Sequence, residues 1–346
     1  MEILATVLQS GWQALAEYLS AHVITCLVPA FFIAGAISVF VPQGALLRYF
    51  GPGANKLVSY SVASVSGAVL AVCSCTVLPL FGGIYKRGAG IGPAVAFLYS
   101  GPAINVLAIV YTARILGYDF GLARAVGAIA FAAGIGLIMA FTFRHGEKAK
   151  DTAIFDALDT SIPGGMQGWQ LAAIFLSLFG ILVFLSAKIW VGAIISLFVL
   201  IWLLWCYVNR YELQAWLTET WRFTRLIVPW LLAGIFAAGV ITAFVPEQAV
   251  SGWVGGNSLL NNFTASFLGA LMYFATLTEV PIISALMKLG MGNGPTLALL
   301  LAGPALSLPN MLVIRSIIGT RKTLAYVGLV VVFATATGLL FGLIYP

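Results

Sequence analysis

One 28-residue stretch occurs twice in this chain, 202 positions apart, and this duplication limits the folds that the chain can adopt. Residues 76–103 and 278–305 share twelve identical positions, and most of them are residues that shape a backbone. The recurring prolines, glycines and lysine are Pro79, Lys86, Gly88, Gly90, Gly92, Pro93, Gly101 and Pro102, which reappear as Pro281, Lys288, Gly290, Gly292, Gly294, Pro295, Gly303 and Pro304. Duplicated halves that interrupt apolar segments in corresponding places are typical of membrane transporters and mark their binding sites.

The composition places the chain in a membrane. Hydrophobic residues make up 61% of its 346 residues and charged residues only 8%, whereas a soluble domain carries about 25% charged residues. Apolar runs of about twenty residues recur along the chain, which is the pattern of membrane-spanning helices and not of a β-barrel. We therefore expect an all-α integral membrane protein, multi-pass, in the cell (inner) membrane.

The apolar runs predict eight spans and five regions. The spans are expected at 22–41, 57–82, 122–143, 168–187, 189–207, 224–245, 262–286 and 323–344. The regions are an interfacial N-terminal helix over 1–21, a first transmembrane repeat over 22–143, a polar cytoplasmic linker over 144–167, two intervening helices over 168–207 and a second repeat over 224–344.

Two further apolar segments, 88–114 and 290–314, are interrupted by Gly-Pro pairs. Pro93 and Pro102 are nine residues apart, so a helix between them is about 13 Å long and cannot cross a hydrocarbon core of ~30 Å. The segment is either one broken span or a re-entrant hairpin with its tip at Gly101-Pro102. The hairpin collects twelve of the seventeen lysines and arginines on one face, which the positive-inside rule makes cytoplasmic.

The hairpin arrangement has two consequences. It inverts the second repeat relative to the first, and it predicts that Arg87 and Arg114 lie on the same side of the membrane. The alternative, ten spans in parallel repeats, spreads the positive charges almost evenly over both faces. The charge asymmetry favours the inverted arrangement.

The duplicated blocks also carry a family resemblance. The stretches CSCTVLPLFGGIYKRGAGIGPAVAFLYSGPAIN and TEVPIISALMKLGMGNGPTLALLLAGPALSLPN resemble the predicted-permease family that includes the ArsP-type organoarsenical efflux permeases. The resemblance extends to the Phe-Val-Pro elements and the polar linker, and so covers most of the chain. It implies a permease of about eight spans that, in characterised members, exports trivalent arsenicals through cysteine thiols.

Cys73 and Cys75 are the thiols to which this resemblance points, because a trivalent arsenical is a soft centre that prefers thiolate ligands. Residues i and i+2 of a helix point about 200° apart, so the two sulfurs share a ligand only where the helix unwinds. Pro79 provides that opportunity by freeing the carbonyl of Cys75. Cys26 is a further candidate thiol ligand of arsenic. The alternative is that all three are small packing residues.

Glu279 is a carboxylate within the expected span 262–286, two residues before Pro281. A charged group at this depth costs about 3 kcal/mol or more unless it faces a cavity or a partner, and it indicates a functional site. Its counterpart in the first repeat is Val77. We expect Glu279 to couple transport to protons; the alternative is a protonated side chain that only donates a hydrogen bond.

The expected substrate site lies at the midplane, where the two Gly-Pro tips approach each other. Each polar residue near the breaks either coordinates substrate or satisfies backbone groups that proline and glycine release. The candidate substrate-binding residues are Cys73, Ser74, Cys75, Thr76, Gly101, Pro102, Asn105, Thr278, Glu279, Gly303, Pro304, Ser307 and Asn310.

These features predict a secondary transporter that moves a small thiophilic solute, such as a trivalent organoarsenical, by proton-coupled alternating access. Two other functions stay open: a membrane thiol-disulfide relay, for which Cys-x-Cys spacing is poor, and a non-transporting subunit of a membrane complex. We expect no enzymatic activity, no cofactor, no resident metal and no nucleic-acid partner. The expected partners are the solute or metalloid substrate and the lipid bilayer; a homo-oligomer or a second membrane subunit stays open.

Overall fold

The computed structural model describes residues 2–22, 27–41, 55, 58–64, 74–86, 88–144, 167–244, 253–272 and 279–345. Within these ranges the chain is helical and contains no strand, which confirms the all-α prediction. The named helices are α1 (Glu2–His22), α2 (Val28–Phe40), α5 (Ser74–Lys86), α6 (Ile91–Ala103), α7 (Val106–Ile115), α8 (Tyr118–Thr142), α10 (Gly168–Ser186), α11 (Trp190–Tyr207), α12 (Arg210–Phe244), α14 (Leu259–Leu271), α15 (Glu279–Lys288), α16 (Asn293–Ala302), α17 (Leu308–Ile318) and α18 (Thr320–Ile344).

Four of these helices, α8, α10, α11 and α18, are long and apolar enough to cross a membrane. They match the spans expected at 122–143, 168–187, 189–207 and 323–344. Much of their outward surface is apolar: Phe141 is 81% exposed, Leu176 76% and Trp205 87%. Large apolar side chains on the outside of helices of this length suit contact with lipid. The protein is therefore a multi-pass membrane protein.

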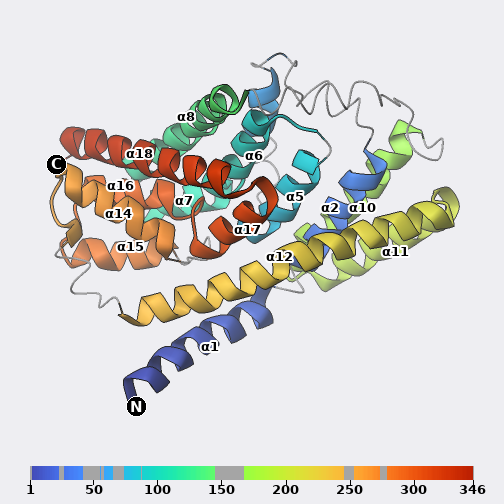
Figure 1. Ribbon diagram of the computed structural model, residues 1–346, viewed down its shortest axis with the longest axis horizontal. Helices are drawn as coiled ribbons and strands as arrows, with labels where there is room; N and C mark the ends of the chain where they lie inside the picture. The colour runs from blue at the N-terminus through green and yellow to red at the C-terminus, as the bar shows by residue number, and fades with distance from the viewer. Residues whose placement is uncertain are drawn as a thin grey trace.

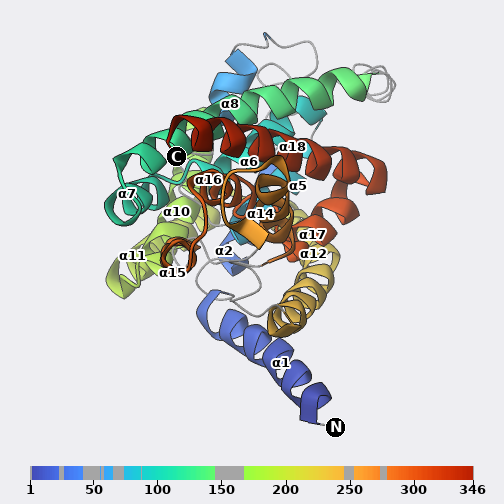
Figure 2. The same ribbon diagram turned by 90° about the vertical axis from the view of Figure 1, so that its left-hand side faces the viewer.

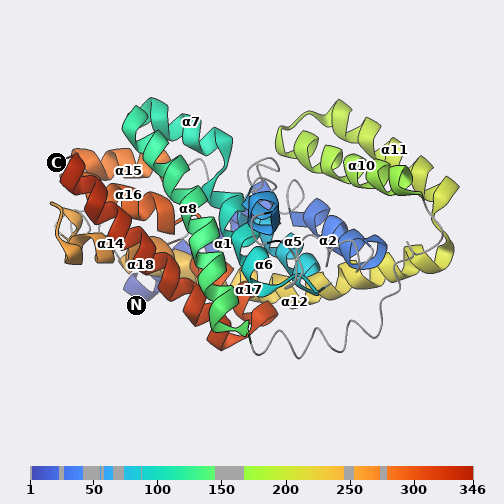
Figure 3. The ribbon, with the colours of Figure 1, turned by 90° about the horizontal axis from the view of Figure 1, so that it is seen from above.

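The helices lie in two groups that share α12. Helices α6 to α8 and α14 to α18 lie together at one end of the molecule, and the α10–α11 pair lies at the other (Figures 1 and 3). The 35-residue α12 runs along both groups and contacts α2 and α17. Helix α1 packs against α12 on the outside (Figure 2).

The segment expected at 88–114 forms two helices, α6 and α7, whose axes differ in direction by 44°. Every residue of α6 is buried, so this short helix lies inside the protein. A re-entrant hairpin needs a near reversal of direction, whereas a 44° bend keeps the chain moving forward. The geometry therefore favours the broken-span alternative for this segment.

The segment expected as one span at 262–286 reverses its direction instead. It contains α14 and α15, and the residues that flank this pair meet: Gly255 and Met291 form an antiparallel bridge, and the Gly292 amide donates to the carbonyl of Val254 at 3.1 Å. A chain that returns to its own starting point has not crossed a membrane. The predicted span is thus replaced by a hairpin, and Glu279 lies at the start of the returning helix.

Helices α5 to α8 correspond in order to α15 to α18, and their connecting glycines adopt matching conformations. Gly88 and Gly290 have φ angles of 99° and 103°, and Gly117 and Gly319, which precede α8 and α18, have 115° and 83°. Both pairs are 202 positions apart. Positive φ strains any residue with a Cβ, which explains the shared glycines.

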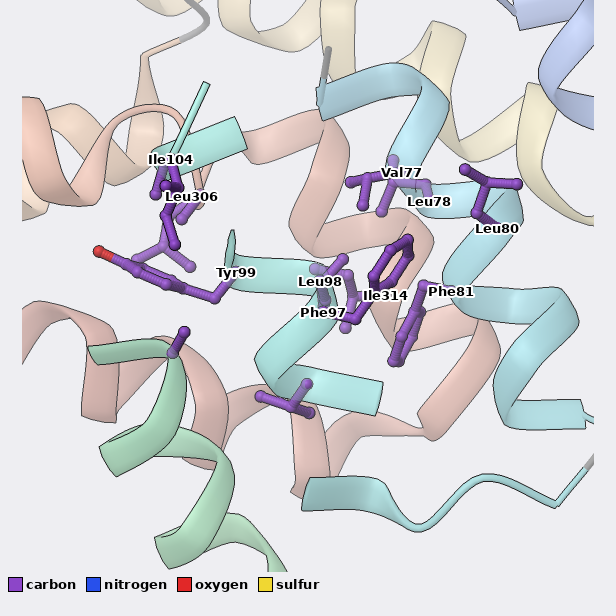
Figure 4. Packing of buried hydrophobic residues seen from close by; sticks show 14 of the residues in the cluster. Val77, Leu78, Leu80, Phe81, Phe97, Leu98, Tyr99, Ile104, Leu306 and Ile314 are labelled. Carbon is purple, nitrogen blue, oxygen red and sulfur yellow. The ribbon is translucent and has the colours of Figure 1, made fainter. Parts of the chain in front are cut away.

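Some residues 202 positions apart also contact each other. The hydroxyl of Tyr99 donates to the carbonyl of Leu301 at 3.0 Å, and the rings of Phe131 and Phe333 meet edge to face at 5.3 Å. Ile104 and its counterpart Leu306 lie at the same end of the buried cluster in Figure 4. A pseudo-two-fold axis between the two halves would bring equivalent positions into contact in this way.

Helices α8 and α18 contact each other and run in opposite directions, as all three ribbon views show (Figures 1, 2 and 3). Each begins after a positive-φ glycine and is 25 residues long. The pair that contains Phe131 and Phe333 is therefore antiparallel.

Candidate functional site

The candidate site is a buried ion pair between Arg124 and Glu279. Glu279 is the first residue of α15, and Arg124 lies in the second turn of α8. The Nη2 atom of Arg124 donates to Oε2 of Glu279 at 3.2 Å, and the two side chains are 0% and 1% exposed. The structure thus supplies a partner for the one carboxylate that the sequence placed in the membrane.

Thr112 of α7 positions the arginine. Its Oγ1 accepts a hydrogen bond from Nη1 of Arg124 at 3.1 Å and donates to the carbonyl of Ala108 at 2.7 Å. Helices α7 and α8 pack closely because Gly121 leaves no side chain between them: a Cβ at Gly121 would lie 2.6 Å from that of Ala113. This close approach brings Thr112 within reach of the guanidinium.

The ion pair keeps unused hydrogen-bonding capacity. Within the part of the chain that the structure describes, Nε of Arg124 and Oε1 of Glu279 are buried and have no hydrogen-bond partner. The hydroxyl of Tyr326, another fully buried side chain, also has none. Buried polar groups are almost always satisfied in folded proteins, so unsatisfied atoms on both members of one ion pair make this pair the candidate site.

The surroundings of the pair are otherwise neutral. Tyr99 lies within electrostatic range of Arg124, Glu279 and Tyr326, and its own hydroxyl is bound to a backbone carbonyl of α16. The positions 202 residues away from Glu279 and Arg124 hold Val77 and Tyr326. The charged pair therefore occurs on one side of the pseudo-two-fold axis only, and the equivalent place is uncharged.

A charge pair this deeply buried contributes little net stability to the fold. Removing two charges from water costs about as much as their attraction returns, so the pair adds little net stability while it is intact. Loss of one partner leaves an uncompensated charge and costs about 3–5 kcal/mol. Any event that neutralises or displaces Glu279 therefore shifts the contact between α8 and α15 strongly.

The structure buries most of the predicted substrate residues that it describes. Thr76 is buried near the start of α5, Asn105 follows the Gly101-Pro102 end of α6, and Ser307 and Asn310 begin α17 after Gly303-Pro304. In the described residues, Oγ of Ser307 and Oδ1 of Asn310 have no hydrogen-bond partner.

The predicted thiol site is not tested by this geometry. Cys26, Cys73 and Thr278 lie outside the described residues, as do the side chains of Ser74 and Cys75 in the first turn of α5. Cys206 at the end of α11 is exposed and free.

Arg124 was missed by the sequence reasoning, which counted it among the charges outside the membrane. It lies in the apolar run GLARAVGAIAFAAGIG, inside the span expected at 122–143. An arginine in one apolar run and a glutamate in another form a recognisable signal, because charges at this depth pair with one another.

Comparison with known proteins identifies the family. Residues 10–343 match the family model ArsP_1, described as a predicted permease. The chain is 42% identical over 375 residues to the UPF0718 protein MJ0584 of Methanocaldococcus jannaschii, covering 99% of this chain and 98% of that protein. It is 24% identical to the UPF0718 protein YraQ of Escherichia coli over 318 residues, with 90% and 76% covered. No solved structure matches. The chain therefore belongs to the ArsP_1 predicted-permease family.

Proposed function

We propose that this protein is a secondary transporter that works by alternating access and is coupled to protons through Glu279. The observation that carries the proposal is the fully buried Arg124–Glu279 ion pair, which joins α8 of one duplicated half to α15 of the other. Carboxylates at membrane depth are the usual proton carriers of transporters. A contact between halves that depends on one titratable charge is suited to a protein that alternates between two arrangements.

The architecture supports two inverted repeats of three crossings and one hairpin each. In the second repeat the crossings are α12, the α16–α17 pair and α18, and the hairpin is α14–α15. In the first repeat they are α2, the α6–α7 pair and α8, and α5 takes the place of α15. With α10 and α11 the total is eight crossings. Between the start of α8 and the start of α18 the chain crosses five times, through α8, α10, α11, α12 and the α16–α17 pair. An odd number of crossings places the two starts on opposite sides of the membrane, which agrees with the antiparallel directions of α8 and α18.

The positive-inside rule supports the same arrangement. Arg124 is inside the protein, so sixteen lysines and arginines remain to be placed. Only Arg114, Lys188 and Lys288 fall on one side. The other side, which we assign to the cytoplasm, holds Arg48, Lys56, Lys86, Arg87, Arg144, Lys148, Lys150, Arg210, Arg222, Arg225, Arg315, Arg321 and Lys322. Thirteen against three is a stronger bias than a hairpin at 88–114 gives.

The cargo that we propose is a small thiophilic solute, such as a trivalent organoarsenical. This part rests on the family resemblance and on the soft-ligand chemistry of Cys73 and Cys75. Cys75 is the second residue of α5, the counterpart of α15, and Cys73 precedes this helix in the sequence. In the register of the duplication, Cys73 and Cys75 correspond to Ala275 and Leu277, which precede Glu279 by four and two residues in the sequence.

Uptake of labelled phenylarsenite into everted membrane vesicles tests the proposal. We expect accumulation that depends on an imposed pH gradient in the native protein, and loss of that dependence in Glu279→Gln, which keeps the shape of the side chain but cannot ionise. Normal gradient-driven uptake by Glu279→Gln between pH 5.5 and 8 would eliminate the coupling role. Absence of uptake by the native protein would remove the arsenical as cargo.

A further inference from the structure

The guanidinium of Arg124 needs a negative charge beside it in every state of the protein. An arginine keeps its proton at any physiological pH, and this one is completely buried. An isolated buried cation is among the most costly groups that a protein can contain. A transport cycle in which Glu279 takes up a proton must therefore supply another anion to Arg124.

Among the residues that the structure describes, the protein offers no second anion at this place. The other acidic residues that the structure describes lie in α1, at the start of α8 and in α12: Glu2, Glu17, Asp119, Glu212 and Glu219. By sequence alone, the remaining five belong to the polar linker or follow α12: Glu147, Asp151, Asp156, Asp159 and Glu247. Among the described residues, Glu219 pairs with Lys86 and Arg222, and Glu212 accepts from the backbone of Asn209. The groups around Arg124 from α6, α7 and α18 are Tyr99, Thr112 and Tyr326, all of which are neutral.

We infer that Arg124 is the binding site for a negatively charged group of the cargo, which takes the place of the Glu279 carboxylate when Glu279 is protonated. This inference rests on the proposed transport function and narrows its substrate class to small thiophilic solutes that also carry a negatively charged group such as a carboxylate. The replacement needs no new cavity, because an incoming carboxylate-sized group occupies the position that the Glu279 carboxylate vacates.

Several hydrogen-bond donors are already present for such an anion. Nη2 of Arg124 becomes free when Glu279 leaves, and Nε is without a partner in the described structure. These two atoms form one edge of the planar guanidinium, which matches the two oxygens of a carboxylate. The hydroxyl of Tyr326 is a further buried donor with no partner among the described groups.

The charge balance determines how many protons accompany each anion. In the empty site, Arg124 and ionised Glu279 sum to zero. In the loaded site, Arg124, a monovalent anion and protonated Glu279 again sum to zero. One proton therefore enters the site with each anion and leaves with it, in the same direction. Transport is electroneutral: a pH gradient drives it, and a membrane potential alone does not.

Anion binding to the purified protein tests this inference without any transport assay. The probe is ¹⁴C-benzoate in equilibrium dialysis against the detergent-solubilised protein, with thiocyanate and nitrate as competitors. For the native protein we expect the affinity to rise about tenfold for each unit of pH decrease while Glu279 is mainly ionised, because one proton accompanies each anion. Arg114→Gln, which removes an exposed arginine of α7, is the matched control and should bind as the native protein does.

The two members of the pair must respond in opposite ways. Glu279→Gln leaves Arg124 without its counter-ion, so it should bind benzoate more tightly than the native protein at pH 7.5, and independently of pH. Arg124→Gln should bind none. The double variant Arg124→Gln, Glu279→Gln has no buried charge to destabilise the fold and should also bind none, which separates loss of the site from loss of structure.

Two results would overturn the inference: benzoate, thiocyanate and nitrate all failing to bind Glu279→Gln, or Arg124→Gln binding benzoate with native affinity. Failure of the proposed transport function gives a different pattern, because benzoate would then bind as expected while vesicles accumulate neither benzoate nor phenylarsenite.

Discussion

The energetic role of the Arg124–Glu279 pair can be measured with a double-mutant cycle. Both side chains are fully buried and the pair has one direct hydrogen bond of 3.2 Å. Glu279→Gln leaves a permanent cation in the interior, and we expect it to lower the free energy of unfolding by about 3–5 kcal/mol. Arg124→Gln should cost less, about 1–3 kcal/mol, because a buried carboxyl group can neutralise itself by binding a proton.

Replacement of both residues should restore most of the loss. The double variant contains two neutral amides of similar size, so its free energy of unfolding should lie within about 1 kcal/mol of the native value. The cycle then gives a coupling energy of about 3 kcal/mol or more, larger than contacting residues usually show. The measurement is reversible unfolding in mixed micelles, followed by far-ultraviolet circular dichroism as the fraction of sodium dodecyl sulfate rises.

The outcome that refutes this reasoning is additivity. If the double variant loses as much stability as the two single variants together, the charges do not interact energetically and the ion pair is not a unit. The buffer must contain no organic anion, because a bound anion would replace the missing carboxylate. Added benzoate should return stability to Glu279→Gln and have no effect on the double variant.

Three further predictions concern topology, packing and thiols. Single cysteines at Arg87 and Arg114, in a background without native cysteines, should react with an impermeant thiol reagent from opposite faces; labelling from one face would restore the hairpin at 88–114. Gly136→Val should lower the free energy of unfolding by about 2 kcal/mol or more in the same micelle assay, because a Cβ there would lie 2.8 Å from a backbone oxygen of α6. Gly328→Ala has open space around it and should instead stabilise α18 by about 0.5–1 kcal/mol. Cys75→Ser should abolish protection of cells against a trivalent organoarsenical at unchanged membrane expression, and retained protection would return this residue to a packing role.

Local sequence signals predicted the helical spans well where each span is one long apolar run. Helices α8, α10, α11 and α18 fall within a few residues of their predicted ranges, because an uninterrupted apolar run of this length has no other stable form in a bilayer. The prediction was poorer where glycine and proline interrupt the run. A break in a helix indicates that the chain changes direction and does not indicate by how much. The sequence therefore did not show that the ends of 262–286 meet, and it left both a broken span and a hairpin open for 88–114.

The sequence by itself determined the class of the protein, the register of its duplication and the position of one membrane-embedded carboxylate. These follow from composition, from local periodicity and from the cost of a charge in lipid. Only the tertiary structure decided that Arg124, 155 residues away, is the partner of that carboxylate, and that the chain reverses between Gly255 and Met291. The physical reason is that an ion pair and a chain reversal are long-range relations: they depend on how helices pack in three dimensions, and no local pattern in either segment specifies which distant residue it will meet.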